Sequence, residues 1–381
     1  MIRLSRANRS ALSEWWWTID RWTVVAILAL VALGIILTLA ASPAVANRLS
    51  LDSFHFVYRQ AVFLVPALIV IFGISFFTTK QVRRLAVCVF FGGLLLMLAT
   101  LFVGPEIKGA TRWLPLGKFS LQPSEFVKPA FVVLVAWMFS EGARSKTVPG
   151  MTLAFIIYTL FIGLLILQPD FGQATLVTLV FGGLLFMVGI SWFWIIGLGA
   201  VGIGGAIAAY QLVPHVASRV DRFMDPASGD TYQIDRAMEA VQAGGFFGRG
   251  PGEGAVKRIL PDAHTDFIFA VAAEEFGVLA GLLIIGLFSF IVIRTLVRAL
   301  DETDLFVQLA ISGLTLLIGA QALINLAVNL NLMPAKGMTL PFISYGGSSL
   351  LALALATGML LSLTRRRVHA GARPAEWRAY A

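Results

Sequence analysis

The stretch LPDAHTDFIFAVAAEEFG, residues Leu260 to Gly277, decides the fold because it takes the chain from a polar loop straight into a long apolar helix. Asp266 stands at the border, preceded by His264 and Thr265 and followed by an apolar run. In a membrane protein such a border lies where a helix meets water, so the Asp266 carboxylate would be close to both phases. This position predicts either a helix N-cap or a catalytic or binding group.

The composition indicates a polytopic membrane protein. Of the 381 residues, 58% are hydrophobic and only 13% are charged, which is too apolar for a soluble globular domain of this length. The formal net charge of +8 comes from basic clusters beside apolar runs, a pattern that orients membrane helices and argues against a nucleic-acid partner. The lone Cys88 leaves no intramolecular disulfide, and four histidines without paired cysteines argue against a structural zinc site.

About ten apolar segments are long enough to cross a bilayer, which takes about 17 to 25 residues. They are 22–42, 57–77, 85–103, 124–140, 151–168, 172–190, 192–213, 267–293, 305–329 and 345–363. Pro169 should end the fifth segment, because proline cannot continue a helix. The sequence therefore predicts an all-α polytopic bundle of about ten transmembrane helices.

Basic residues are concentrated in every second connection between these segments. The clusters are Arg3, Arg6 and Arg9; Lys80, Arg83 and Arg84; Arg144 and Lys146; Arg294 and Arg298; and Arg365, Arg366 and Arg367. Because lysine and arginine collect in cytoplasmic loops, both termini are predicted to be cytoplasmic. We expect one transmembrane domain, 1–381, with an N-terminal tail 1–21, a large outer loop 214–266 between helices seven and eight, and a C-terminal tail 364–381. The connections 104–123, 168–171 and 330–344 share the outer side.

The outer loop 214–266 is too long to be a mere connection and should hold function or a partner surface. Within it, Tyr232 to Ala243 has a helix-forming composition, and Gly244 to Gly254 is dense in glycine. No strand precedes these glycines, as a nucleotide-binding fingerprint would require. We therefore expect a flexible lid or a re-entry at the membrane surface rather than a nucleotide cradle.

Several charged residues lie within apolar segments. Glu125 and Lys128 are three residues apart and share a helix face, so they can form either a structural ion pair or part of a functional site. Glu274 and Glu275 require a polar cavity or a partner charge. Polar amides such as Asn325 are predicted to form hydrogen bonds between helices, as are Asn329 and Asn331.

Two outer connections have compositions suited to binding. Arg112, Trp113, Lys118 and Gln122 offer cations and an aromatic face for a phosphate or a sugar, although an interfacial anchor would use the same residue types. The loop 333–349 is interrupted by proline and glycine. Backbone this irregular at a membrane edge must be buried in protein or line a water-filled cavity.

Four motifs resemble those of the SEDS family (shape, elongation, division and sporulation), the membrane glycosyltransferases that polymerise peptidoglycan. They are TRWL (111–114) with QPSE (122–125) and Lys128, QPDFG (168–172), HTDFIF (264–269) and PFISYGGSS (341–349). Their order matches the family's over nearly the whole chain. The segments KGMTLP (336–341) and 248–273 look more like the division branch of the family than its elongation branch.

The resemblance implies polymerisation of lipid II at the outer face of the cytoplasmic (inner) membrane, with Asp266 at the position of the family's essential aspartate. A carboxylate there can take the proton of an attacking sugar hydroxyl, and single displacement with inversion needs only this base and a stabilised leaving group. A covalent intermediate would need a second carboxylate, and no obvious candidate adjoins Asp266 in sequence. Glu125 and Lys128 correspond to a pair inside the family's membrane cavity.

Candidate residues for the substrate and its diphosphate are Arg112, Lys118, Gln122, Arg222, Arg249, His264, Thr265, Lys336, Ser344 and Ser348. A divalent cation, Mg²⁺ or Mn²⁺, is a further candidate for binding the diphosphate. The resemblance also implies three associations: with lipid II, with a class B penicillin-binding protein that acts as transpeptidase, and with divisome regulators at the septum. A lipid II flippase, a scaffold for the transpeptidase and the elongation-type polymerase stay as alternatives.

Overall fold

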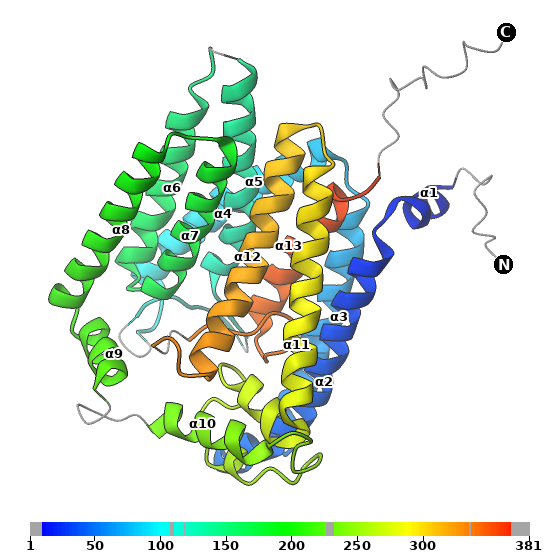
Figure 1. Cartoon of the computed structure of the whole chain (residues 1–381), viewed down its shortest axis with the longest axis vertical. Helices are drawn as coiled ribbons and strands as arrows, with labels where there is room; N and C mark the ends of the chain where they lie inside the picture. Colours follow the sequence, from blue (N-terminus) through cyan, green and yellow to red (C-terminus); the bar gives the residue numbers. More distant parts are fainter. Residues whose placement is uncertain are drawn as a thin grey trace.

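The computed structural model describes residues 10–106, 110–117, 119–145, 147–225, 232–334 and 337–366. Helices make up most of this part of the chain (Figure 1). In the first half they are α1 (Ala11–Thr18), α2 (Arg21–Arg48), α3 (His55–Ser75), α4 (Thr79–Val103), α5 (Pro123–Arg144), α6 (Gly150–Leu167) and α7 (Phe171–Val188). In the second half they are α8 (Trp192–Leu212), α9 (Pro214–Met224), α10 (Tyr232–Gly244), the 3-10 turn η2 (Val256–Arg258), α11 (Ile268–Leu300), α12 (Leu305–Asn329) and α13 (Gly347–Leu363).

Each predicted membrane segment coincides with one helix. Within the described residues, nine helices are long and apolar enough to cross a membrane, and the shorter apolar helix α13 supplies the tenth segment. The chain turns back at Pro169 between α6 and α7, as the sequence predicts. The all-α polytopic membrane fold is confirmed.

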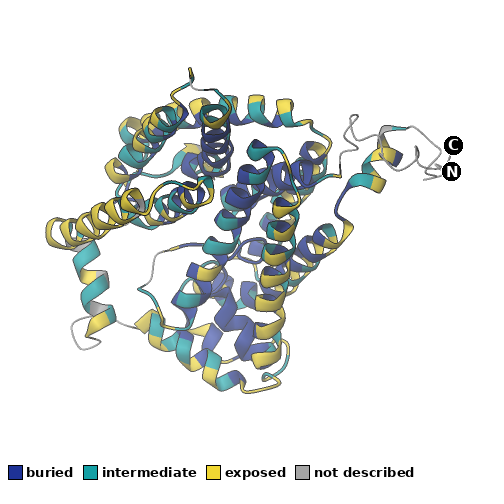
Figure 2. Ribbon diagram, turned by 45° about the horizontal axis from the view of Figure 1, so that its top comes forward, coloured by how far each residue is buried: buried dark blue, intermediate teal, exposed yellow. Residues whose placement is uncertain are grey.

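The centre of the bundle is formed by α5 and α12. α12 packs against α5, α7 and α11, while α13 packs against α3. Of the most apolar 18-residue window of α12, 72% is buried, whereas the corresponding value for α8 is 0%. α8 therefore lies at the periphery, where Figure 2 shows it almost wholly exposed. Its apolar side chains are explained only by a lipid environment.

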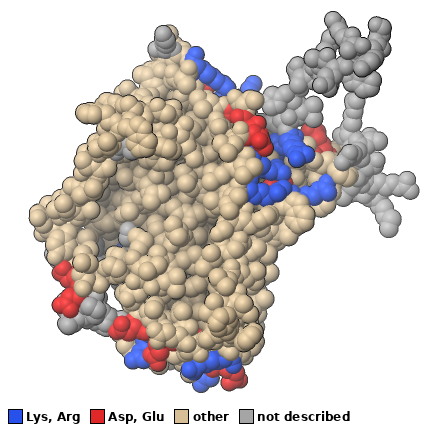
Figure 3. Space-filling view, viewed as in Figure 1, with Lys and Arg blue, Asp and Glu red and all other residues tan. Residues whose placement is uncertain are grey.

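Charged side chains gather at two ends of the molecule and leave an uncharged belt between them on the face seen in Figure 3. We call one end the basic end; Arg83, Arg144, Arg294 and Arg298 lie there. The opposite end, where α9 and α10 lie, is called the cavity end (Figure 1). This distribution suits a protein whose middle faces lipid.

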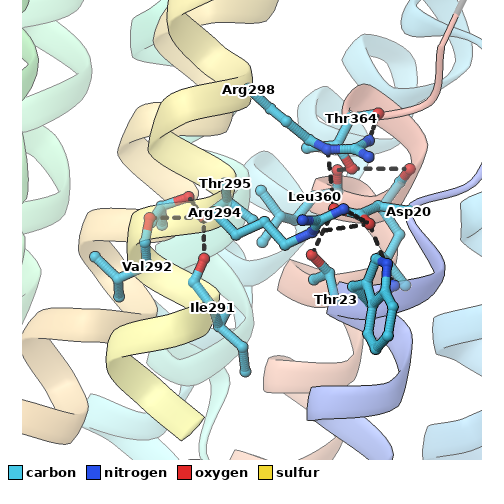
Figure 4. A network of polar contacts seen from close by, with 12 residues as sticks. Asp20, Thr23, Ile291, Val292, Arg294, Thr295, Arg298, Leu360 and Thr364 are labelled. Atoms are coloured by element: carbon cyan, nitrogen blue, oxygen red, sulfur yellow. Dashed lines mark hydrogen bonds and ion pairs between the residues drawn. The ribbon is translucent and has the colours of Figure 1, made fainter. Parts of the chain in front are cut away.

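At the basic end, Asp20 joins α2 to α11 (Figure 4). Its carboxylate is 1% exposed and accepts hydrogen bonds from Arg294 Nε at 2.7 Å and from Thr23 Oγ1 at 2.8 Å. Arg298 Nε lies 2.9 Å from the same oxygen, Oδ2. Asp20 is also the N-cap of α2 and accepts from the Trp22 amide at 3.2 Å. A buried carboxylate with two guanidinium partners holds the helix ends together.

α11 is broken at Gly277, where φ is 76° and ψ is −173°. Its first part, 268–276, is buried apart from the partly exposed Phe276, and apolar residues exposed toward lipid begin only at Val278 and Leu279. The predicted span 267–293 thus begins where α11 begins, but it misses the break at Gly277 and the continuation of the helix to Leu300. A Cβ at position 277 would lie 2.3 Å from the Phe246 carbonyl oxygen, so the close approach requires glycine.

The glycine-rich loop 244–254 is bonded to this break. The amides of Arg249 and Gly250 donate to the carbonyls of Glu274 and Glu275, both at 3.0 Å, and the Val278 amide donates to the Gly245 carbonyl at 2.9 Å. These bonds satisfy backbone groups that the interrupted helix leaves open. The loop is thus a clamp on the break in α11, not the free lid that its composition predicts.

Candidate active site

A cavity of about 780 Å³ opens at the cavity end of the bundle. Its lining comes from α3, α5, α7, α10, α12 and the start of α13, from strand β2 (Phe119–Leu121), and from the loops that precede its partner strand β1 (Leu114–Leu116), α5, α11 and α13. Asp266 is part of the lining. The volume is in the range of small-molecule sites, so a sugar and its diphosphate could enter together.

The backbone of Asp266 is held by two asparagines of α12. The Nδ2 groups of Asn325 and Asn329 donate to the Asp266 carbonyl at 3.0 and 2.9 Å. Asn329 also accepts, through Oδ1, the hydrogen bond of the Ala270 amide at 3.2 Å. Asn329 thus links α12 to α11 as predicted, whereas Asn325 bonds to loop carbonyls; together the two fix the position of the Asp266 backbone.

Asp266 is not the cap of α11. The N-cap residue is Phe267, without a side-chain cap hydrogen bond, and α11 begins at Ile268. Asn329 instead accepts from the Ala270 amide of the first turn, which also donates to the Phe267 carbonyl at 3.1 Å. The N-cap interpretation of the sequence is therefore wrong, because an acceptor from α12 takes that role. The Asp266 carboxylate is left in the cavity wall, where the adjoining Gly337 offers no side chain to cover it.

The loop before α13 fixes the residues just before Asp266. Ser344 Oγ donates to the Thr265 carbonyl at 2.5 Å and accepts from the Leu340 amide at 2.8 Å. The Tyr345 amide donates to the His264 carbonyl at 2.9 Å. Ser344 is buried and is not part of the cavity lining, and its role in substrate binding stays a prediction. It positions the Asp266 loop.

His264 likewise lies behind the cavity and does not line it. Its ring packs against Phe56 and Tyr345, with centroid distances of 4.3 and 5.4 Å. Burial lowers the pKa of His264 from 6.5 to about 4, although the nearby Asp262 charge acts in the opposite direction. The imidazole is therefore neutral near pH 7 and packs against two aromatic rings, and its contact with substrate stays a prediction.

Three of the sequence motifs meet at one wall of the cavity. Arg112 Nη1 lies 3.3 Å from Asp170 Oδ1, and Gln122 Nε2 donates to Asp170 Oδ2 at 3.4 Å. Ser348 Oγ accepts from the Gln122 amide at 3.2 Å and donates to the Ser120 carbonyl at 3.1 Å. Asp170 is buried and caps α7. Arg112, Gln122 and Ser348 therefore line the cavity as predicted, on a scaffold held by Asp170.

Glu125 and Lys128 form the predicted ion pair, with 2.9 Å between Oε2 and Nζ. Gln173 of α7 donates to Glu125 Oε1 at 2.6 Å and accepts from Lys128 Nζ at 2.8 Å. Lys128 also contacts Gln321 Oε1 of α12 at 3.4 Å. Glu125 lines the cavity and Lys128 lies behind it. The pair joins α5, α7 and α12 below the cavity floor.

Glu275 finds the partner charge that the sequence requires, and Glu274 is satisfied by backbone amides. Glu275 is paired with the buried Lys257 of η2. Glu274 accepts from the amides of Val256 and Lys257 at 2.7 and 2.9 Å. Neither glutamate lines the Asp266 cavity, so this cluster supports the half-helix from behind.

The remaining predicted site residues divide into three groups. Thr265 lines the cavity, whereas Arg249 is part of the clamp and donates to the Ala243 carbonyl at 3.2 Å. Arg249 is not part of the cavity lining, and its role in substrate binding stays a prediction. Lys118, Lys336 and the side chain of Arg222 lie outside the residues that the structure describes.

Two charged lining residues were missed. Arg59 of α3 lies in the cavity wall, and an arginine inside an apolar segment was the signal for it. Asp262 also lines the cavity, four residues before Asp266. The cavity lining therefore holds a second aspartate besides Asp266, which the sequence motifs did not single out.

Comparison with known proteins decides the family. A family model described as cell cycle protein, covering FtsW, RodA and SpoVE, matches residues 21–369. The chain belongs to the FtsW/RodA/SpoVE family. This is the SEDS family that the motifs predict.

FtsW/RodA/SpoVE relatives match the chain over most of its length. A probable peptidoglycan glycosyltransferase FtsW of Caulobacter vibrioides is 50% identical over 364 residues, which are 95% of this chain and 93% of the relative. The RodA structure of Thermus thermophilus, a rod shape determining protein, matches with a TM-score of 0.68 and 30% identity, covering 92% of this chain and 97% of that one. A chain of a peptidoglycan synthase complex that coordinates polymerization and crosslinking matches with a TM-score of 0.73 and 30% identity, covering 91% and 97%.

Proposed function

We propose that this protein is a peptidoglycan glycosyltransferase of the FtsW type that polymerises lipid II, with Asp266 as the general base. The position of Asp266 supports its assignment as the base. Its backbone is fixed by two asparagines, and it lines the cavity together with Arg59 and Arg112. A positioned carboxylate beside cations suits a reaction in which a proton leaves one substrate and an anion leaves the other.

The reaction joins two lipid-linked disaccharides. The hydroxyl oxygen of one sugar attacks the anomeric carbon of the other, and the bond from that carbon to the diphosphate breaks with its electron pair on the departing oxygen. Asp266 takes the hydroxyl proton as the new glycosidic bond forms. One displacement inverts the anomeric centre, which is the outcome that we propose.

The lipid diphosphate leaves with negative charge, so cations must face it. Arg59 and Arg112 are the described cationic residues of the cavity lining, and Arg112 is oriented by Asp170. Guanidinium groups bind phosphate through two parallel hydrogen bonds, which makes them suitable here.

A divalent cation is a further proposal. Among the described residues, no group of three or more His, Cys, Asp or Glu side chains could hold a metal ion alone. Mg²⁺ is commonly held by one or two carboxylates together with substrate phosphates. The carboxylates of Asp262 and Asp266 fit such a shared site for Mg²⁺ or Mn²⁺, which would add positive charge at the diphosphate.

We further propose that the cavity end faces the periplasm and that both termini are cytoplasmic. The basic clusters at the opposite end of the bundle support this orientation. By similarity to a chain of a peptidoglycan synthase complex, we propose a class B penicillin-binding protein as partner. The similarity to FtsW supports action at the division septum with divisome regulators.

The test is polymerisation of purified lipid II by the full-length protein with its transpeptidase partner. Asp266→Asn removes the base with little change in shape and should abolish glycan strands. Asp262→Asn is the comparison variant: it removes the other proposed metal ligand of the cavity lining and should lower the polymer yield without abolishing it. Unchanged polymer yield from Asp266→Asn would refute the assignment of the base, and loss only in Asp262→Asn would move it to that residue. Transport of labelled lipid II without polymer would identify a flippase instead.

A further inference from the structure

A second cavity, of about 800 Å³, lies between the C-terminal half of α2 and the loop that carries η2. It shares no lining residue with the Asp266 cavity. One side is apolar and includes Ile36, Leu39 and Pro43 of α2. Ile36 and Leu39 are 48% and 41% exposed on a membrane helix. The apolar side is therefore continuous with the surface that faces lipid chains.

The opposite side of this cavity is cationic. Arg48 and Arg258 line it, and both residues are exposed. The Arg48 guanidinium donates to the carbonyls of Ile259 and Leu260 at 3.3 and 2.7 Å, which orients the group without neutralising it. Within the described chain, neither arginine forms an ion pair with an acidic side chain. Two uncompensated positive charges thus stand where the apolar surface ends.

Between the two sides lies a buried acceptor. Glu275 lines the cavity and is 1% exposed. Its Oε1 is paired with Lys257, whereas Oε2 has no hydrogen-bond partner among the described residues. A buried carboxylate oxygen without a donor is costly, by about 1–3 kcal/mol or more. The cavity therefore lacks one hydrogen-bond donor that a ligand can supply.

We propose that this cavity binds a phospholipid of the surrounding bilayer whose headgroup carries an N–H or O–H donor. The phosphate lies on Arg48 and Arg258, the headgroup donor meets Glu275 Oε2, and an acyl chain follows Ile36 and Leu39. Ethanolamine and glycerol headgroups supply such a donor. Choline supplies none, because its nitrogen carries only methyl groups.

The bound lipid would brace the half-helix that leads from Asp266. Glu275 and Phe276 belong both to this half-helix and to the cavity lining. Lys257, which pairs with Glu275, also donates to the Ala40 carbonyl of α2 at 3.0 Å. A lipid between α2 and η2 therefore adds contacts to a junction that already joins α2 to the break in α11. This inference rests on the second cavity alone and not on the proposed reaction.

The experiment is native mass spectrometry of the full-length protein, exchanged into detergent with phosphatidylethanolamine, phosphatidylglycerol or phosphatidylcholine. The wild type should retain either of the first two about tenfold more strongly than phosphatidylcholine, the effect of one hydrogen bond to a charged group. Arg258→Gln should weaken retention of all three by a similar factor. Ala44→Trp fills the cavity and should abolish retention.

Ile35→Trp is the matched control, because Ile35 is exposed on the same helix outside the cavity lining. Three results would overturn the proposal: equal retention of phosphatidylcholine, equal behaviour of Ala44→Trp and Ile35→Trp, or displacement of the phospholipid by undecaprenyl diphosphate. The last result would make the cavity a substrate site. Since no readout is polymerisation, failure here is distinguishable from failure of Asp266 as the base.

Discussion

Asp20 and Asp266 occupy the same kind of place in the sequence, each at a border between a polar segment and an apolar helix, yet the structure treats them differently. Asp20 caps α2, is 1% exposed and meets two arginines. Asp266 leaves the capping of α11 to Asn329 and lines an open cavity. The Asp20 carboxylate joins two helices through its arginine partners, whereas Asp266 lines a cavity that a ligand can enter.

The largest difference should be in activity. Asp266→Asn is expected to lower the rate of lipid II polymerisation by about 10²–10⁴-fold, the usual contribution of a general base. Its thermal unfolding should stay close to that of the wild type, because the Asn325 and Asn329 bonds go to the backbone. Initial rates and melting curves of the two proteins measure this. A large loss of thermal stability would place Asp266 in the same class as Asp20.

Asp20→Asn should show the converse behaviour. Removing one partner of a buried ionic cluster leaves Arg294 and Arg298 without their shared counterion, and we expect a loss of about 3 kcal/mol in stability. The folded fraction should still polymerise lipid II, because the cluster lies at the basic end, away from the cavity. Denaturant unfolding in detergent and rates normalised to folded protein check both statements. Loss of polymerisation at full stability would contradict the structural role.

A third expectation concerns pH and His264. Its folded pKa of about 4 is below the ordinary 6.5, so the unfolded chain binds the proton first as the pH falls. Its contribution to stability is complete above pH 6.5 and declines as the pH falls toward 4, by up to about 3 kcal/mol. Melting curves of the wild type and of His264→Phe at pH 7.5 and 5 isolate the contribution of His264 to the pH dependence of stability. Equal losses in the two proteins would show that burial does not suppress protonation of His264.

The smallest effect should come from Ser344, which holds the Asp266 loop. Ser344→Ala removes the bonds to the Thr265 carbonyl and the Leu340 amide and should cost about 1–2 kcal/mol, with a slower rate of polymerisation. Ser42→Ala is the control, since Ser42 donates to the Ser53 carbonyl at 2.7 Å away from the cavity. It should lose stability alone. Equal rates for the two variants would remove Ser344 from the positioning of Asp266.

The helices could be predicted from the sequence because lipid imposes a minimum length on apolar segments and basic residues mark their ends. The break at Gly277 could not, since a glycine in an apolar run is compatible with a straight helix, and only contact with Phe246 demands its backbone angles. The interpretation of the glycine-rich loop 244–254 as a lid was wrong for the same reason. The loop bonds to the break in α11, a contact between separate parts of the sequence.

The sequence identified residues of the cavity lining when they belong to a motif that fixes both the residue type and the direction of the side chain. Arg112, Gln122 and Ser348 line the cavity because they belong to motifs that fold onto one another. His264 and Ser344 have suitable chemistry but are not part of the cavity lining, and residue type alone does not reveal the direction of a side chain. Arg59 could have been found as an isolated charge within an apolar segment.

The break at Gly277 also affects the position of Asp266 relative to the lipid headgroups. A straight helix as long as α11, 33 residues, would measure about 50 Å, whereas the hydrocarbon core of a bilayer is about 30 Å thick. Unbroken, it would carry Asp266 well beyond the level of the lipid headgroups, where a diphosphate on a lipid carrier must lie. By turning the first part of α11 into the body of the protein, the glycine keeps the carboxylate at the height of a substrate that cannot leave the membrane surface.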